Sequence, residues 1–519
     1  MIQENSVDVL VIGAGISGLT AAREILKCDA KLKVTVLEAD GRVGGRMLTE
    51  PLPCANGKTE VFDLGAGYVS KSQTHIMDLV NEFGLQVYPQ YTKGKKIMQL
   101  GKANDPKVYQ TEIPPLSIPA LVESELMRRK VESLIKKVPI EDPYSVENAE
   151  KKDCNSIASQ TKHWMFTKDA YNTFDAAFRA VFGADSSRIS YLFALAFCNS
   201  CGGGMRLFQA NEFGAQEYKI KGGTQQICEL LADQIGRENV LLNHFVSCIK
   251  QSKESVEVRT KDGKVFSSRY LIVTIPPHRI PFLQFDPPLP EVRRIMYENI
   301  PAGNLTKFVA TYETPFWREK GFSGEVVSDG GKSPLPGCDR GPVSITYDGT
   351  TTTGSPALLG FIGSREAIQW NEKTDEERKH AVLGALANFF GDEALNPTAY
   401  REYSWDKNPY IQGGPVNIVP PGMMKDYPTI RKPFGRVFFA GADTATYWVG
   451  YMSGGVQSGQ RAAAEVLHNI KGDSFPRERL LGTVYGPMKY DKKIPLDGTQ
   501  PSIWDYGLVA DIFGMRSLE

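Results

Sequence analysis

The first forty residues place two short apolar runs on either side of a segment with helical periodicity. Val7–Ile12 and Lys33–Glu38 are rich in aliphatic and β-branched side chains, as is typical of buried parallel strands. Between them, Leu19–Lys27 repeats apolar residues at the spacing of one helix face. The order strand, helix, strand predicts a βαβ unit with a right-handed crossover onto a parallel sheet.

Two further groups of elements follow far downstream. The strands of the middle group are expected at Val240–Leu242, Cys248–Gln251, Ser255–Thr260 and Tyr270–Thr274. Lys261–Gly263 predicts a hairpin turn between two of them. In the last group, the strand pattern Val437–Ala440 leads into a glycine and then the helix pattern Ser458–Ile470. This group has the same strand-to-helix form as the N-terminal unit.

Charge and apolar content narrow the class of protein. Lysine plus arginine and aspartate plus glutamate each number 60, and the pI is near 7. No basic stripe stands out, so no nucleic-acid partner is expected. The longest uncharged run, 189–205, is broken by polar residues and glycines, which favours a buried helix over a membrane span. No secretory signal is visible, and we expect a soluble, intracellular (cytoplasmic) protein.

The cysteines indicate neither a disulfide framework nor a metal site. The chain has 8 of them, scattered as suits a reducing compartment. Cys198 and Cys201 are the only close pair, without a second pair or a histidine at ligand spacing. We expect them to pack in the core, with a redox Cys-x-x-Cys as the alternative, and we expect no metal.

A glycine motif follows the first strand. Gly13 permits a tight turn, Gly15 lets the backbone approach a pyrophosphate, and Gly18 allows close packing of helix on strand. The helix N-terminus then offers free N–H groups and a positive dipole end to phosphates. Glu38, at the end of the second strand, is placed to accept hydrogen bonds from ribose hydroxyls. Together these features predict a dinucleotide site.

The residues after Glu38 favour FAD over NAD. Arg42 and Arg46 offer guanidinium forks to phosphate oxygens, and glycines that include Gly45 let the chain wrap a bulky cofactor. The segment Glu38–Arg46 resembles the E-x-x-x-R-x-G-G-R motif of glutathione-reductase-like flavoproteins, and most closely that of the flavin amine oxidases. Asp63–Val69 resembles the loop that these enzymes place beside the isoalloxazine ring.

The resemblance extends over about residues 5–470 and is closest to the monoamine oxidases. Separate motifs carry it, in the family's order. They are Cys201–Gly203, which resembles the start of the active-site strand, then Lys221–Gln225, Thr274–Pro277, Phe285–Pro290, Pro315–Trp317, Phe438–Thr444, Gly450–Val456 and Gly459–Ala463.

The resemblance implies a mixed α/β fold with two interleaved domains. One is a glutathione-reductase-like Rossmann domain that binds FAD, and the other is a substrate domain of mixed sheet and helices. We expect the FAD-binding domain at 1–85, 222–295 and 401–470, the substrate domain at 86–221 and 296–400, and a tail packed on the surface at 471–519.

The resemblance also implies roles for single residues. Lys307 aligns with the lysine that holds a water against flavin N5, Trp405 with a tryptophan packed near the ring, and Tyr451 with one wall of an aromatic cage. A lysine there would stabilise charge that develops on oxygen, and an aromatic face orients an amine. Further cofactor contacts are implied at Gly65, Ala66, Val246, Gly441, Asp443, Tyr451 and Met452. Pocket residues are implied at Leu207, Phe208, Gln216, Ile345, Phe361 and Val416.

The chain departs from the monoamine oxidases at Gly413–Val416. Their Gly-Gly-Cys-Tyr segment supplies a cysteine bound to the flavin and a second cage tyrosine, whereas this chain has Pro415 and Val416. Proline cannot form a thioether, so we expect non-covalent FAD and a cage with one aliphatic wall. The C-terminal segment is too short and polar for the membrane anchor of mammalian members.

These features predict FAD-dependent oxidative deamination of a primary, or secondary, amine, with O2 reduced to H2O2. An L-amino-acid or polyamine oxidase of the same fold is the alternative. No acidic pair can be placed in the pocket, which disfavours a diamine, and Arg206 is the candidate partner for a substrate carboxylate. A flavin-binding scaffold and a desaturase-like enzyme at a membrane stay open as other classes. The expected partners are a small amine and O2, with a homodimer as an open option.

Overall fold

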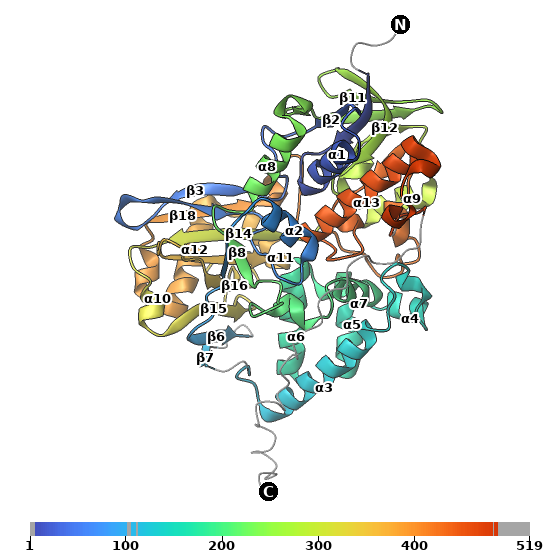
Figure 1. Ribbon diagram of the computed structural model, residues 1–519. Helices are drawn as coiled ribbons and strands as arrows, with labels where there is room; N and C mark the ends of the chain where they lie inside the picture. Colours follow the sequence, from blue (N-terminus) through green and yellow to red (C-terminus); the bar gives the residue numbers. More distant parts are fainter. Residues whose placement is uncertain (1–5, 101–104, 111–112, 481, 486–519) are drawn as a thin grey trace, which may run out of the picture.

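Two sheets organise the computed structural model, which describes residues 6–100, 105–110, 113–480 and 482–485. The first sheet lies at the top of Figure 1, and the second lies at the left. A group of helices fills the lower right of the same view. The fold is a mixed α/β architecture, as expected from the sequence.

The first sheet contains the predicted βαβ unit. Its order is β13-β10-β11-β12-β1-β2-β9, and β19 also pairs with β12. The strands β12, β1, β2 and β9 are parallel neighbours, as the apolar runs predict. Their bounds are β1 Ser6–Ile12, β2 Val34–Leu37, β9 Val240–Leu241, β10 Val246–Gln251, β11 Val256–Thr260, β12 Val265–Val273, β13 Gln284–Asp286 and β19 Val437–Phe439.

Helices α1 (Ile16–Cys28), α8 (Gln225–Ile235) and α13 (Met452–Lys471) accompany this sheet (Figure 1). α1 and α13 pack closely because glycines remove side chains at their contact. A methyl group on Gly459 would lie 2.4 Å from the Ser17 carbonyl oxygen. The last helix therefore lies against the helix that opens the dinucleotide motif.

The second sheet is mixed and has the order β18-β14-β17-β16-β15-β6-β7. Its bounds are β6 Lys95–Gln99, β7 Lys107–Tyr109, β14 Leu305–Thr311, β15 Phe322–Ser328, β16 Val343–Asp348, β17 Ala357–Gly363 and β18 Ala399–Ser404. Two small antiparallel pairs join β3 Thr49–Pro53 to β4 Thr59–Asp63, and β5 Val87–Pro89 to β8 Tyr218–Ile220.

The remaining helices lie near α13, around the second sheet and in the lower part of the molecule (Figure 1). Their bounds are α2 Thr74–Glu82, α3 Ile118–Ile135, α4 Ala149–Asp153, α5 Ile157–Trp164, α6 Lys168–Phe182, α7 Tyr191–Ser200, α9 Glu291–Asn299, α10 Phe316–Glu319, α11 Ser364–Asn371 and α12 Asp375–Phe390. α7 is buried along nearly its whole length. It confirms the buried helix expected within 189–205, which ends in a glycine turn.

The structure corrects two sequence expectations. Cys201–Gly203 is a turn after α7, and the strand of this region is the short β8. α13 begins at Met452, six residues before the expected Ser458. The glycines of its first turns hide the helical pattern, because glycine lowers helix propensity. Here they are required by contact, since a methyl on Gly454 would lie 2.2 Å from the Trp448 carbonyl oxygen.

We propose that the two sheets mark the two interleaved domains. β19, far along the chain, pairs with β12, which brings the predicted segment 401–470 to the first sheet. β18 belongs to the second sheet and crosses the expected boundary at residue 400. Of the predicted tail, residues 486–519 lie outside the described residues, whereas Phe475 and Leu480 are buried in the core of the first sheet.

Candidate active site

A single continuous cavity joins the glycine motif to the second sheet. Its volume is about 530 Å³. One end is formed by the turn after β1, and the other by α6, β15 and β16. The end of the cavity that would hold a dinucleotide is therefore continuous with a chamber at the other end.

Gly13 and Gly18 of this turn have no room for a side chain. Gly13 has φ +103°, and a methyl group on it would lie 2.5 Å from Thr274 Oγ1. A methyl on Gly18 would lie 2.0 Å from the Gly13 carbonyl oxygen. Gly15 lies next to Gly45, and a methyl group on Gly15 would lie 3.9 Å from the Gly45 Cα. The turn thus fits a pyrophosphate at the N-terminus of α1.

Glu38 is held by the same turn. One carboxylate oxygen accepts a hydrogen bond from Ala14 N–H at 2.6 Å, and the other accepts one from Asp40 N–H at 2.8 Å. Burial raises the pKa of this carboxyl, and the two backbone donors oppose that shift. Glu38 lines the cavity and keeps free lone pairs for ribose hydroxyls.

The two arginines of the loop donate hydrogen bonds to different parts of the chain. Arg42 donates to the carbonyls of Gly45 and Met47 at 2.7 and 3.1 Å, so it braces the loop from behind. Arg46 donates to the Pro415 carbonyl at 2.7 Å and to the Asp443 carboxylate at 3.0 Å. Arg46 therefore ties the first cofactor loop to two segments near the end of the described chain.

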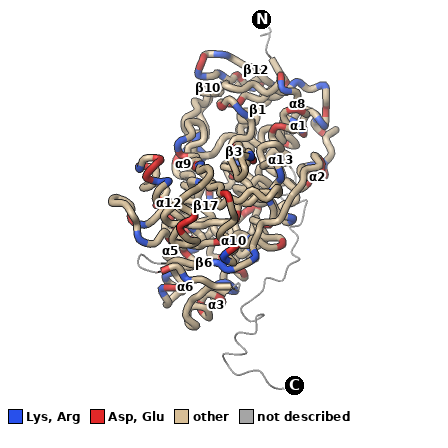
Figure 2. The backbone as a smooth tube through the Cα atoms, turned by 90° about the vertical axis from the view of Figure 1, so that its left-hand side faces the viewer, with Lys and Arg blue, Asp and Glu red and all other residues tan. Residues whose placement is uncertain are grey.

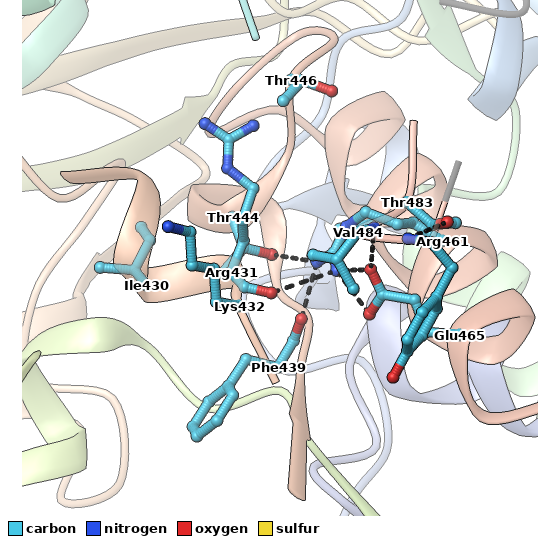
Figure 3. Close-up of polar contacts among 12 residues, drawn as sticks. Ile430, Arg431, Lys432, Phe439, Thr444, Thr446, Arg461, Glu465, Thr483 and Val484 are labelled. Atoms are coloured by element: carbon cyan, nitrogen blue, oxygen red, sulfur yellow. Dashed lines mark hydrogen bonds and ion pairs between the residues drawn. The ribbon is translucent and has the colours of Figure 1, made fainter. Parts of the chain in front are cut away.

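A buried ion pair supports those segments (Figure 3). Arg461 and Glu465 on α13 are 3.0 Å apart, and both are almost fully buried. Arg461 also donates to the Phe439 carbonyl at 2.7 Å and to Thr444 Oγ1 at 3.1 Å. The loop between these residues carries Gly441 to the cavity wall. The ion pair thus fixes the end of β19 where it meets the cofactor site.

Lys307 is buried on β14 and lines the cavity. Its ammonium donates to the Gly65 carbonyl at 3.1 Å and lies 5.7 Å from the centre of the Phe361 ring. Burial lowers the pKa of this ammonium to about 8, and the carboxylate of Asp63 opposes the shift. A lysine with such a pKa changes charge near neutral pH.

Aromatic side chains surround the middle of the cavity. Tyr451 packs edge-on against Trp448 at 4.9 Å between ring centres. Trp405 packs against Tyr403 at 4.8 Å. Burial raises the pKa of the Tyr451 hydroxyl, so this ring stays neutral. Val416 is buried beside Gly450 and lines the cavity together with Tyr451.

The structure brings most of the predicted site residues to this one cavity. Those that line it are Gly13, Gly15, Glu38, Gly45, Arg46, Gly65, Ala66, Leu207, Phe208, Gln216, Val246, Lys307, Ile345, Phe361, Trp405, Val416, Gly441, Tyr451 and Met452. Gly18, Arg42 and Asp443 lie behind the lining and support it.

One pocket residue offers a free acceptor. The Gln216 amide donates to the Leu207 carbonyl at 3.2 Å. Its side-chain oxygen is buried and accepts no hydrogen bond from the described residues. Such an orphaned oxygen on an otherwise apolar wall is suited to an N–H donor of a ligand.

Sequence reasoning missed several walls of the chamber. Tyr68, Phe197 and Tyr347 line it, as do small residues of α6 such as Ala177. Glu325 on β15 also lines it and lies 3.5 Å from the ammonium of Lys96. Only Tyr68 lies within a segment that the family resemblance had singled out, and the others carry no local motif.

Arg206, the candidate partner for a substrate carboxylate, lies in a 3-10 helix at Met205–Phe208. It is buried, and it is not among the described residues that line the cavity. Its guanidinium lies 5.9 Å from the centre of the Phe213 ring. The cavity therefore gains no carboxylate-binding arginine from this position.

Comparisons with known proteins agree with this arrangement. A family model described as flavin-containing amine oxidoreductase matches residues 16–467. A flavin-containing amine oxidase of Oncorhynchus mykiss is 34% identical over 91% of this chain and 87% of its own length. The chain belongs to the flavin-containing amine oxidoreductases. Flavin-containing amine oxidase B of Homo sapiens is 33% identical over 89% of this chain and 86% of its own length.

Solved structures give the same assignment. Cyclohexylamine oxidase from Brevibacterium oxydans matches with a TM-score of 0.81 and 29% identity, covering 90% of this chain and 99% of that one. Wild-type putrescine oxidase with bound putrescine matches with a TM-score of 0.80 and 27% identity, covering 89% and 99%. The family resemblance, the Rossmann-type FAD domain and the enzyme class are confirmed, and the cofactor of this flavin amine oxidase is FAD.

The part of the chain that the structure describes contains neither a candidate membrane span nor a candidate metal cluster. None of their helices is long and apolar enough to cross a bilayer. No group of three or more histidine, cysteine, aspartate or glutamate side chains in that part of the chain is arranged to hold a metal ion. Lysine and arginine are interspersed with aspartate and glutamate along the tube in Figure 2.

Proposed function

We propose that this enzyme oxidises a primary amine, or a secondary one, with O2 as the electron acceptor. The amine loses two electrons and two protons to become an imine. Water hydrolyses this imine to an aldehyde and ammonia when the substrate is a primary amine, and to an aldehyde and a primary amine when it is secondary. O2 takes up the two electrons and two protons and becomes H2O2. The observation that carries the proposal is the continuity between the dinucleotide cradle and an apolar, aromatic chamber.

Bound FAD supplies the two-electron acceptor for the α-hydrogen of the amine. The residues of this chain bind and orient the amine. Tyr451 and Trp405 offer aromatic faces, which attract an amine without acting as strong bases. The orphaned oxygen of Gln216 accepts from the substrate N–H. The apolar walls favour the neutral amine, because burial disfavours a charged group.

Lys307 serves the second half of the reaction. Its ammonium points into the cavity from β14 and is anchored by the Gly65 carbonyl. A positive charge there stabilises negative charge that develops on oxygen during its reduction. Its pKa of about 8 means that the lysine is mostly charged at neutral pH.

The charges at the far end of the chamber favour a monoamine. Glu325 is ion-paired with Lys96, and the pair is electrically neutral. A diamine would need a carboxylate for its second ammonium, and Lys96 already competes for this one. The position of Arg206 outside the lining disfavours an amino acid in the same way.

We further propose that the FAD is bound without a covalent tether. Pro415 lines the cavity at the position where the monoamine oxidases carry the linking cysteine. No cysteine is among the described residues of the lining. His244 does line it, but its backbone N–H donates to the Glu38 carbonyl at 2.7 Å, which places it at the ribose end. As separate proposals, the enzyme forms a homodimer and is located in the cytoplasm. Sedimentation would measure the first property, and cell fractionation would measure the second.

A peroxide-release screen tests the proposed activity. The yellow holoenzyme is mixed with primary amines, secondary amines, L-amino acids and polyamines, and H2O2 is measured. Monoamines are expected to release peroxide and to bleach the flavin under anaerobic conditions. A colourless protein, or peroxide only from amino acids or polyamines, contradicts the proposal. Bleaching without reoxidation in air would place the enzyme with those that use another acceptor.

A further inference from the structure

We propose that Asp63 is a positioning residue that acts on Lys307. Asp63 keeps the Lys307 amine charged. The sequence motifs placed Asp63 at the start of a loop beside the isoalloxazine ring and gave it no part in the reaction. The inference rests on the proposed function in one respect, which is that Lys307 faces the flavin.

The carboxylate of Asp63 and the ammonium of Lys307 both lie beside Gly67. A methyl group on Gly67 would lie 3.2 Å from Asp63 Oδ2 and 3.3 Å from Lys307 Nζ. The carboxylate and the ammonium therefore flank the same point of the backbone, which has no room for a side chain. Opposite charges beside the same buried backbone position favour the charged form of each other.

The hydrogen bonds of Asp63 assign its two oxygens to different tasks. Oδ1 accepts from Thr49 Oγ1 at 2.6 Å, from Thr224 N–H at 2.8 Å and from Thr224 Oγ1 at 3.2 Å. These contacts fix the carboxylate and leave Oδ2 toward Gly67 and Lys307. Burial raises the pKa of this carboxyl, and both Lys307 and the threonine contacts oppose that shift.

Lys219 brings a second buried amine to the same region. It lies on β8, and its ammonium donates to the Asp348 carbonyl at 3.2 Å. The Asp348 carboxylate is engaged elsewhere, with Arg318 at 2.6 Å and Trp317 at 2.8 Å. Burial lowers the pKa of Lys219 to about 8, and repulsion from Lys307 contributes to that shift. Lys219 is thus a further titratable group in the surroundings of Lys307.

The other titratable groups around Lys307 are tyrosines. Tyr68 and Tyr347 line the cavity near it, and Tyr403 is its partner on the neighbouring strand β18. Burial raises the pKa of the Tyr68 and Tyr347 hydroxyls, so these rings stay neutral while Lys307 titrates. Asp63 is therefore the charged group that the structure places beside the Lys307 ammonium.

The test is a pH titration of the absorption spectrum of the oxidised holoenzyme, which requires no turnover. A charge beside the flavin shifts its absorption, so wild type is expected to show a transition that Lys307→Met lacks. Asp63→Asn keeps the shape and the contact with Thr224, and it is expected to move the midpoint down by about 1 pH unit or more.

Matched controls change a charge nearby without facing Lys307. Glu60→Gln lies on β4 with Asp63, and Lys221→Met follows β8, where its side chain is exposed. Both are expected to retain the wild-type midpoint. The proposal is overturned by a midpoint that Asp63→Asn leaves unchanged or moves upward, or by a wild-type spectrum without a Lys307-dependent transition. Failure of the amine screen leaves this titration readable, so the two failures are distinguishable.

Discussion

Arg46 donates from one guanidinium nitrogen to the Pro415 carbonyl at 2.7 Å and from the other to the Asp443 carboxylate. One side chain thus joins the loop after β2 to segments that lie 369 and 397 residues farther along the chain. Because Asp443 is buried, loss of this partner leaves an uncompensated charge next to the cofactor site.

Arg46→Met is expected to weaken FAD binding by about 10- to 100-fold, since hydrogen bonds to charged groups contribute about 1.5–3 kcal/mol. The dissociation constant is measured by titrating apoprotein with FAD and following flavin fluorescence. Arg401→Met is the control, because it removes an exposed pair with Glu50. Equal affinity in Arg46→Met and wild type would show that the bridge does not hold the cofactor loops.

The same neighbourhood predicts that the flavin is extractable. Acid or heat denaturation of the holoenzyme is expected to release intact FAD into the supernatant, because Pro415 offers no thiol for a thioether. The measurement is the absorbance of the supernatant and of the washed pellet. Flavin fluorescence that follows the denatured chain on a gel would contradict the expectation.

Lys307→Met is expected to slow flavin reoxidation by about 100-fold while anaerobic reduction by amine stays near the wild-type rate. In wild type, the oxygen rate constant depends on the charged lysine. It is therefore highest well below pH 8 and falls as pH rises through about 8, where the pKa of Lys307 lies. Stopped-flow mixing of reduced enzyme with O2 measures both effects. A pH-independent oxygen rate constant in wild type would remove Lys307 from this role.

Local signals in the sequence identified the cofactor half of the site and only part of the chamber. The glycine turn and Glu38 follow from spacing, because a βαβ unit places them at the same end of two adjacent strands. Arg42 is of a residue type that often binds phosphate, yet its guanidinium donates to the Gly45 carbonyl of its own loop. Which way a loop side chain turns depends on nearby carbonyls that no spacing reveals.

The chamber was harder to predict because its walls come from strands of the second sheet. Alternate residues of a strand face opposite sides, so register decides whether Glu325 or Val326 faces the cavity. Glu325 lines it, whereas Val326 is packed in the core behind it. A one-residue error in pairing would exchange them. Family resemblance supplied Ile345 and Phe361, but Glu325 and Tyr347 had no motif to mark them.

Gly18→Ala is expected to lower the free energy of unfolding by about 1–3 kcal/mol and to weaken FAD binding, as overpacking does elsewhere. The added methyl would lie 2.0 Å from the Gly13 carbonyl oxygen. Gly384→Ala is the matched control on α12, where a methyl meets nothing within 4 Å. Alanine there is expected to stabilise the helix by up to about 1 kcal/mol. Thermal melting with and without FAD measures both, and a neutral Gly18→Ala would show that the turn tolerates movement.

Gln216→Leu tests the orientation of the amine. The substitution keeps the approximate volume and removes the buried oxygen that no described residue uses as an acceptor. The dissociation constant for the amine in anaerobic flavin reduction is expected to rise about 2- to 10-fold, which corresponds to one hydrogen bond of about 0.5–1.5 kcal/mol. Gln226→Leu, a half-buried position on α8 that is not among the described lining residues, is the control. If Gln216→Leu binds the amine as tightly as wild type, the substrate nitrogen does not lie beside this amide, and the pose must be set by Tyr451 and Trp405 alone.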